Sequence, residues 1–243
     1  MTGVTRGRIG PVAARIEAGW RERFRRTLAK VGPRRLAFGV DLLMRRADEL
    51  CAREDVPLAE ARLRVYEFTR WRVARRLEKT GACVVDPTSG RDAFACDRSL
   101  GGLARWLRAA GYRADVMSTE QAKDAARAGA VALTTDTGVL AGTDALALLW
   151  IPPGLAPPRQ MGLVLRDLGL SARAARCMAC GGVPSAVPRE AVAERIPPRT
   201  ARWRDAYAVC AGCGRLLWEG THWERIAARI AAERPAPRDP GRP

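Results

Sequence analysis

Apolar positions in the first third of the chain recur at the spacing of a helix. Between residues 36 and 51 they form one stripe, and a second run begins at Pro57 and reaches Leu77. Proline suits the first turn of a helix, and Gly81 suits its end. The pattern predicts two helices within a basic helical segment, which we place at residues 1–85, although residues 1–30 allow no assignment of their own.

Short apolar runs alternate with helical patterns in the middle of the chain, at residues 93–170. Strands fit residues 93–97, 112–117, 130–135 and 146–151, and helices fit residues 99–110, 119–128 and 159–168. Strands separated by helices indicate a parallel sheet with right-handed crossovers. We therefore predict an α/β fold in which helices flank a parallel sheet.

Regular periodicity is weak in the following segment, at residues 171–226, but the segment holds two CxxC pairs. The pairs are Cys177 with Cys180 and Cys210 with Cys213. A short helical pattern follows at about residues 223–233. The proline-rich tail, residues 235–243, is predicted to be disordered.

The two CxxC pairs predict a metal site. Each pair supplies two thiolates from one tight turn, and together they complete the closed tetrahedral site that zinc prefers. A redox dithiol or an iron site are the alternatives. The scattered Cys51, Cys83 and Cys96 are expected to be small core residues. We expect a structural role for His222, the single histidine.

The charge balance favours a polyanionic partner. Lysine and arginine number 42 against 26 acidic residues, which gives a formal net charge of +16. Such a charge attracts nucleic acid, which is the class of partner we expect, although the scarcity of lysine also fits a compositional bias of the genome. One face of the second predicted helix is basic and is either a solvated face or a docking surface for RNA or an acidic protein partner. Its members are Arg62, Arg70, Arg72, Arg75, Arg76 and Lys79.

Neither a membrane span nor a signal peptide is evident. The longest apolar stretch, at residues 145–153, is far shorter than a membrane span needs. The first twenty residues contain arginines and lack the apolar core of a secretion signal. We expect a cytoplasmic protein that has no membrane partner.

Two aspartates stand where predicted strands end. Asp97 follows residues 93–96, and Asp136 follows residues 131–135. Carboxylates at the carboxyl edge of a parallel sheet face one crevice and suit Mg²⁺ or Mn²⁺. Such an ion can activate water toward a phosphodiester. The plainer alternative is that both aspartates cap the elements that follow.

Further residues complete the candidate catalytic site. Glu120 and Asp124 lie one helical turn apart and are candidates for a third carboxylate, and Asp144 is a candidate for a fourth. Basic side chains on the helix after Asp97 are candidates for holding an RNA phosphate. These substrate-binding candidates are Arg98, Arg105 and Arg108.

Residues 97–112, which read DRSLGGLARWLRAAGY, closely resemble the start of the Mut-seven C-terminal RNase domain. Residues 133–140 resemble its second signature, and the two CxxC pairs with residues 213–225 resemble its fused zinc ribbon. The resemblance implies a PIN-like nuclease fold and metal-dependent RNA cleavage, with Asp97 and Asp136 as metal-binding acids.

One region departs from the pattern of that family. Residues 117–124 hold fewer acids than its members usually carry there, and they include Lys123. On the resemblance and the two aspartates, we interpret the chain as a metal-dependent endoribonuclease, a hydrolase with structural Zn²⁺ and catalytic Mg²⁺ or Mn²⁺. The departure favours the alternative, a catalytically degenerate RNA-binding protein on the same scaffold. A third hypothesis is a protein–protein adaptor.

Overall fold

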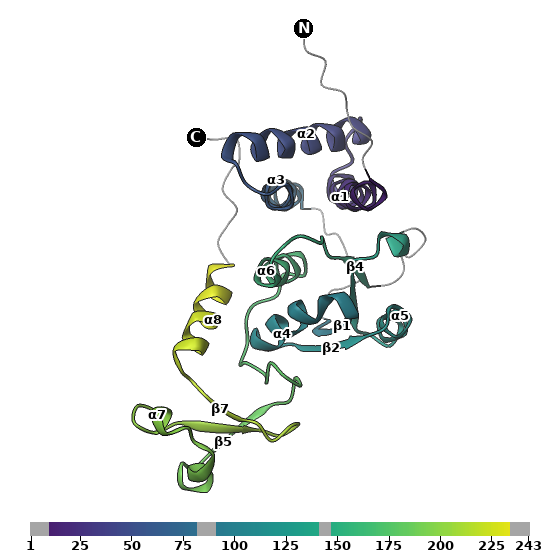
Figure 1. Cartoon of the computed structure of the whole chain (residues 1–243). Coiled ribbons are helices and arrows are strands. Elements are labelled where there is room, and N and C mark those ends of the chain that lie inside the picture. Colours follow the sequence, from purple (N-terminus) through teal and green to yellow (C-terminus); the bar gives the residue numbers. More distant parts are fainter. Residues whose placement is uncertain (1–9, 82–90, 141–146, 234–243) are drawn as a thin grey trace.

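The computed structural model describes residues 10–81, 91–140 and 147–233. Its N-terminal part contains three helices (Figure 1), and its middle part contains four strands and their connecting helices. The helices are α1 (Pro11–Ala29), α2 (Leu36–Glu54) and α3 (Leu58–Thr80). The middle part comprises β1 (Ala93–Asp97), η1 (Arg98–Leu100), α4 (Gly101–Ala109), β2 (Arg113–Met117), α5 (Thr119–Arg127), β3 (Val131–Thr134), η2 (Thr137–Leu140), β4 (Leu148–Trp150) and α6 (Pro157–Asp167).

The C-terminal part contains a second sheet and a final helix. Its elements are β5 (Pro184–Val187), η3 (Glu190–Arg195), α7 (Pro198–Ala201), β6 (Tyr207–Cys210), β7 (Leu216–Trp218) and α8 (Thr221–Ala232). The strands pair antiparallel in the order β5-β6-β7. We call residues 177–218 the cysteine unit. The predicted tail and Cys83 lie outside the described residues.

The four strands of the middle part form a parallel sheet in the order β2-β1-β3-β4, which confirms the predicted α/β class. Alternate residues of β1 face opposite sides of the sheet. Phe94 and Cys96 join the core with α4, α6 and α8, whereas Ala95 packs with Ala122 and Ala126 of α5. Burial raises the pKa of Cys96 to about 12, as suits an inert core thiol.

The N-terminal helices share a core with the sheet. Trp20 and Phe24 of α1 are fully buried, and Trp20 packs edge-on against Trp150 at the end of β4 with 5.9 Å between ring centroids. The structure thus has a helix, α1, where the sequence allowed no assignment, and it lies against β4. The N-terminal helices and the sheet share one apolar core, so the packing itself does not mark a domain boundary at residue 85. The predicted boundary stays a prediction.

Buried and half-buried ion pairs join the same helices to α6. Arg23 of α1 pairs with Asp167 and donates to the Trp150 carbonyl, and Tyr66 of α3 donates to Asp167 at 3.0 Å. At the other end of α6, Arg159 donates to Glu60 of α3 at 2.8 Å and to Glu233 at 2.9 Å. Charges from α1, α3 and the C-terminal end of α8 therefore converge on one helix.

Close packing at Gly19 gives a testable prediction. A Cβ added there would lie 2.5 Å from the Trp150 ring. Helix propensity alone would make alanine stabilising by about 1 kcal/mol, but overpacking costs about 1–3 kcal/mol. We expect Gly19→Ala to lower the free energy of unfolding in urea. Gly101→Ala is the control, because nothing lies within 4 Å of its added Cβ. Equal behaviour of the two variants would contradict the packing.

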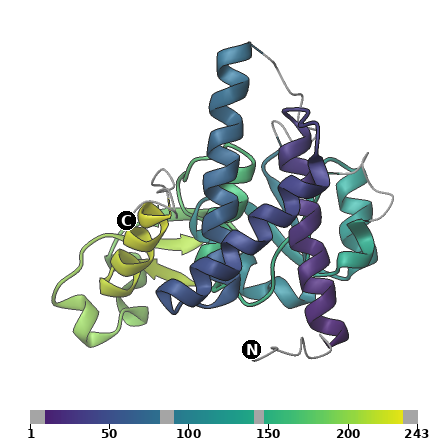
Figure 2. The ribbon, with the colours of Figure 1, turned by 90° about the horizontal axis from the view of Figure 1, so that it is seen from above.

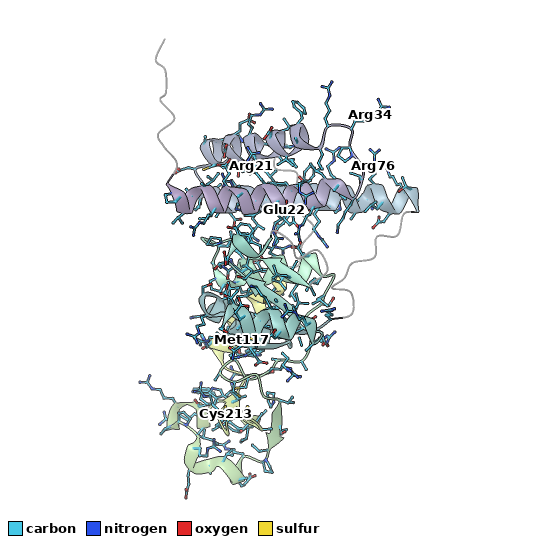
Figure 3. The ribbon with its side chains drawn as sticks, turned by 90° about the vertical axis from the view of Figure 1, so that its right-hand side faces the viewer. Arg21, Glu22, Arg34, Arg76, Met117 and Cys213 are labelled. Atoms are coloured by element: carbon cyan, nitrogen blue, oxygen red, sulfur yellow. The ribbon has the colours of Figure 1, made fainter. Side chains whose placement is uncertain are left out.

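The three parts follow one another along the molecule. Figure 3 shows the N-terminal helices with Arg21 and Glu22 at one end, Met117 of the sheet in the middle and Cys213 at the other end. Among the described residues, none of the helices combines the length and the hydropathy that a membrane span requires.

Candidate functional site

Asp97 is the buried carboxylate at the end of β1, with 6 % of its surface exposed. Its Oδ1 accepts hydrogen bonds from the Ser99 hydroxyl and, at 2.9 Å, from the Ser99 amide, so that it caps η1. Its Oδ2 accepts the Thr135 amide at 2.8 Å. Asp97 therefore caps one element and also ties the end of β1 to the end of β3.

Asp136 lies at the carboxyl end of β3, the strand next to β1. Its amide donates to the Thr134 hydroxyl at 3.0 Å, and its Oδ1 accepts the Gly138 amide at 2.8 Å. Because β1 and β3 are parallel neighbours, the structure brings Asp97 and Asp136 to one pocket of about 460 Å³. We call this the acidic pocket; its other lining residues are Arg98, Ser99, Ser118, Thr119 and Thr135.

Glu120 and Asp124 do not line the acidic pocket. Their side chains are 80 % and 74 % exposed on α5, where Glu120 pairs with Lys123 at 2.9 Å and Asp124 pairs with Arg127 at 2.5 Å. Asp144 lies outside the described residues. Within the described part of the chain, the pocket thus gathers two of the predicted carboxylates.

The three candidate arginines separate in space. Arg98 is exposed and lines the acidic pocket, whereas Arg105 lines a different cavity, beside Cys177 and Trp223. Arg108 is buried, and its guanidinium donates to the carbonyls of Ala114, Met178 and Ala179. Arg108 therefore fastens α4 to β2 and to the loop of the first cysteine pair, which is a structural placement rather than the expected contact with substrate.

Sequence reasoning missed the contribution of α5 to the pocket. Ser118 is the N-cap of α5 in a capping box with Gln121, and Ser118 and Thr119 bring hydroxyls and the first turn of the helix to the pocket. The signal was present in the sequence, because serine followed three residues later by glutamine is the mark of such a box.

Sequence reasoning also missed Trp150, which does not line the pocket but holds one of its lining residues, Thr135. Its indole N–H donates to the Thr135 carbonyl at 3.1 Å, and Thr135 in turn donates to Asp97. Its ring is buried against Trp20 of α1. No local signal reveals this role, because its partners lie far away in the sequence.

The four predicted metal-binding cysteines meet in one place. Their sulfur atoms all lie within 4.8 Å of one another, with 3.3 Å between those of Cys180 and Cys210 and 3.8 Å between those of Cys177 and Cys213. In the described part of the chain this is the single group of three or more candidate ligands so gathered. Four thiolates are soft donors with the chemistry to hold a metal such as zinc.

Backbone amides support the cysteine sulfurs. Gly182 and Gly212 donate to the sulfurs of Cys180 and Cys210, both at 3.4 Å. A hydrogen bond from the Cys213 backbone lowers the pKa of Cys210 to about 6, which favours the thiolate. A Cβ on Gly182 would lie 2.7 Å from the Cys210 sulfur, so the close approach of the two turns requires glycine there.

His222 is exposed at the start of α8, beside Trp218 and Trp223 in the cavity that Arg105 lines. It does not belong to the cysteine cluster. Its expected structural role stays a prediction.

The acidic pocket and the four cysteines both lie in the part of the chain that is similar to a known family. A family model described as the Mut7-C RNAse domain matches residues 92–230, which is more than half of the chain. No curated protein and no solved structure matches the chain. The matched range contains Asp97, Asp136 and all four clustered cysteines, and an RNase domain indicates a nuclease-type function on RNA. The chain belongs to the Mut7-C RNAse domain family.

Proposed function

We propose that this protein is a metal-dependent endoribonuclease that cleaves RNA at the acidic pocket. The observation that carries the proposal is the meeting of Asp97 and Asp136 at the ends of two adjacent parallel strands. Carboxyl edges of such sheets are where ligands bind. The PIN-like architecture that the resemblance implies is part of the proposal.

The donor set of the pocket fits a hard cation. Two carboxylates and the hydroxyls of Ser99, Ser118 and Thr135 offer oxygen atoms, which Mg²⁺ and Mn²⁺ prefer. Such a cation, held by one or two carboxylates and completed by water, supplies charge neutralisation and an activated water for phosphodiester hydrolysis. We assign Asp97 and Asp136 as its protein ligands.

The chain's own residues prepare the pocket for a phosphate. The Ser99 and Thr135 amides hold the Asp97 carboxylate in one orientation, so that its position is set before a ligand binds. Arg98, exposed at the pocket, offers a guanidinium to the phosphate backbone. Glu120 and Asp124 stay predictions as third ligands, since each would have to give up its present partner, Lys123 or Arg127.

We assign the cysteine cluster to a structural zinc ion and the cysteine unit to the zinc ribbon of the family. Four thiolates close such a site, so the zinc stabilises the fold and takes no part in cleavage. RNA as the substrate and a cytoplasmic location complete the proposal.

One observation favours a second candidate, the catalytically degenerate RNA-binding protein. The carboxylates of α5 do not line the pocket and are paired with cationic side chains, which leaves two acids rather than three or four among the described lining residues. A cage with fewer carboxylates binds a divalent cation less tightly. The two candidates differ in cleavage and agree in RNA binding.

The test is cleavage of end-labelled RNA in the presence of Mn²⁺ or Mg²⁺. We expect Asp97→Asn and Asp136→Asn each to lower the rate by more than about 100-fold, because loss of an outer partner of a metal site already costs roughly 10- to 100-fold. Asp115→Asn is the control, since this carboxylate lies on β2 and does not line the pocket. Binding of Mn²⁺ should fall with the rate in both pocket variants.

The outcomes separate the candidates. RNA binding without metal-dependent cleavage by the wild-type protein would support the degenerate candidate. Cleavage that survives the double variant Asp97→Asn/Asp136→Asn would contradict the nuclease assignment to this pocket. A loss in Glu120→Gln or Asp124→Asn as large as in Asp97→Asn would identify α5 as the source of a third ligand.

A further inference from the structure

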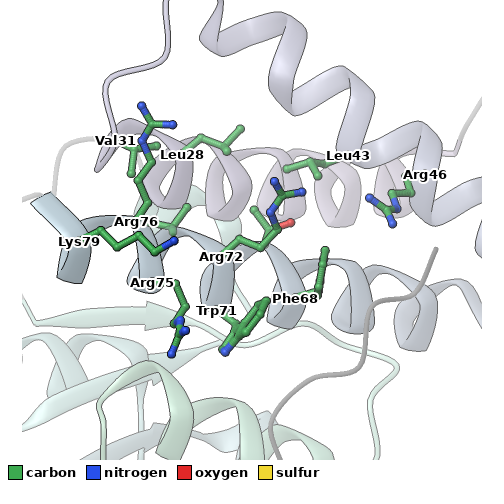
Figure 4. A pocket seen from close by; sticks show the side chains of 12 residues that line it. Leu28, Val31, Leu43, Arg46, Phe68, Trp71, Arg72, Arg75, Arg76 and Lys79 are labelled. Carbon is green, nitrogen blue, oxygen red and sulfur yellow. The ribbon is translucent and has the colours of Figure 1, made fainter. Parts of the chain in front are cut away.

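A groove of about 640 Å³ runs along the C-terminal half of α3, next to the end of α1 and the middle of α2 (Figure 4). We call it the α3 groove. It lies in the N-terminal helices, outside the range that matches the RNase family. Figure 2 shows that the end of α3 projects beyond the other helices and the sheet.

The floor of the α3 groove is apolar. Four of its side chains are aliphatic, and two are aromatic, of which Trp71 is 42 % exposed. The apolar members are Leu28, Val31, Leu43, Phe68, Trp71 and Val73. An apolar groove on a charged surface is the type of site that accepts the apolar face of a partner.

The rim of the α3 groove is cationic. Arg72, Arg75, Arg76 and Lys79 are spaced along α3 so that they lie on one side of the helix. Among the residues that the structure describes, these four form no ion pair with a carboxylate, in contrast to Arg23 of the interior. The rim therefore offers uncompensated positive charge to an acidic partner.

The aromatic rings distinguish between two classes of anionic partner. The Arg72 guanidinium lies over Phe68 at 5.9 Å, and the Arg75 guanidinium lies over Trp71 at 6.0 Å. A single-stranded nucleic acid needs open aromatic faces on which its bases stack. Here the chain's own arginines cover a face of each ring, and the rest of the floor is aliphatic, which suits leucine-like side chains better than bases.

We propose that the α3 groove binds an amphipathic helix of a partner protein, one whose apolar stripe is flanked by aspartate and glutamate. Its apolar residues, spaced at i, i+3 or i+4 and i+7, pack on the floor of the groove, in the helix-in-groove mode of recognition. Its carboxylates reach Arg72, Arg76 and Lys79 and fix the orientation of the helix. This role is independent of RNA cleavage at the acidic pocket.

The probe is a synthetic peptide of about 18 residues, or five helical turns, with leucine along one face and glutamate beside it. A scrambled peptide of identical composition carries the same charge without the apolar stripe. Fluorescence polarisation with the full chain should show about tenfold or greater preference for the patterned peptide, equivalent to about 1.4 kcal/mol.

Two variants locate the binding surface. We expect the affinity for the patterned peptide to fall about tenfold or more in Arg72→Glu/Arg76→Glu and also in Trp71→Ala. Loss of an anchor residue at an interface has an effect of this size. Arg199→Glu/Arg202→Glu is the matched control, because it makes the same change in net charge at exposed positions outside the groove. Melting temperatures of all variants confirm that they are folded, and RNA cleavage should be unchanged in the groove variants.

Three outcomes would overturn the proposal. The scrambled peptide could bind as tightly as the patterned one, which would reduce the interaction to net charge. The control pair could weaken binding as much as the groove pair. Binding of a single-stranded oligouridylate of about 20 nucleotides could require Trp71 and Arg72 while the patterned peptide does not bind at all. This result would assign the groove to RNA.

Discussion

Replacement of Cys210 by serine is expected to abolish zinc binding and to unfold the cysteine unit while the parallel sheet stays folded. Cys210 is 1 % exposed at the end of β6, and its sulfur lies 3.3 Å from that of Cys180. The described apolar core of the unit is small, comprising Val192, Ile196, Tyr207 and Leu216. Units with so little core depend on a metal or a disulfide for stability.

The size of this effect follows from the energy of metal binding. A structural zinc site contributes about 10–16 kcal/mol in small zinc peptides at neutral pH, more than a core of four residues supplies. Metal analysis should show one zinc ion per wild-type chain and close to none in Cys210→Ser. Limited proteolysis should cut the variant within residues 177–218 and spare α4 and α6, whose core is separate.

Cys51→Ser is the matched control, because the same chemical change is made at a half-buried thiol outside the cluster. Its zinc content should equal that of the wild-type protein. A Cys210→Ser variant that keeps its full zinc content would exclude the four-cysteine site.

Removal of the Asp167 carboxylate, in Asp167→Ala, is expected to lower the free energy of unfolding by about 3–5 kcal/mol, the usual cost of breaking a buried ion pair. Asp167 and Arg23 are both 8 % exposed at the side chain. Tyr66 donates to the same carboxylate, and Arg70 lies 3.3 Å from it. The variant leaves the Arg23 guanidinium buried without its counter-charge.

Urea denaturation measures the loss, and hydrogen exchange locates it. Faster exchange should appear first in α1 and α3, the helices that the carboxylate joins to α6. Asp41→Ala is the control, because its pair with Arg21 is about half exposed on both sides and such surface pairs contribute about 0–1 kcal/mol. Similar small effects in both variants would show that Asp167 does not hold α1 and α3 to α6.

The position of α1 illustrates where sequence information ends. Ile16, Trp20, Phe24 and Leu28 recur every fourth residue, a helical spacing from which we drew no assignment for residues 1–30. That pattern does not show that Trp20 packs on Trp150, since the contact joins residues 130 positions apart. Packing of this kind is set by the complementary shapes of surfaces that only the folded chain brings together.

For the acids of the candidate site, the sequence also predicted some positions and not others. Asp97 and Asp136 were predicted together because each ends a strand, and adjacency of β1 and β3 in the sheet brings them into one pocket. Glu120 and Asp124 share a helix with Ala122 and Ala126, whose burial against the sheet turns the acids outward. Alanines give a weak apolar signal, so the sequence did not reveal which face of α5 is buried.

The sequence by itself determined the α/β class, the parallel sheet and the grouping of the four cysteines as a candidate metal site. Each of these depends on local spacing along the chain. The tertiary structure alone decided that Arg108 is buried behind the cysteine loop, that Trp150 supports the Thr135 carbonyl, and that α3 leaves a basic groove open. These features depend on which strands become neighbours and on which distant surfaces meet. Both are fixed by packing between residues far apart in the sequence, which local spacing does not show.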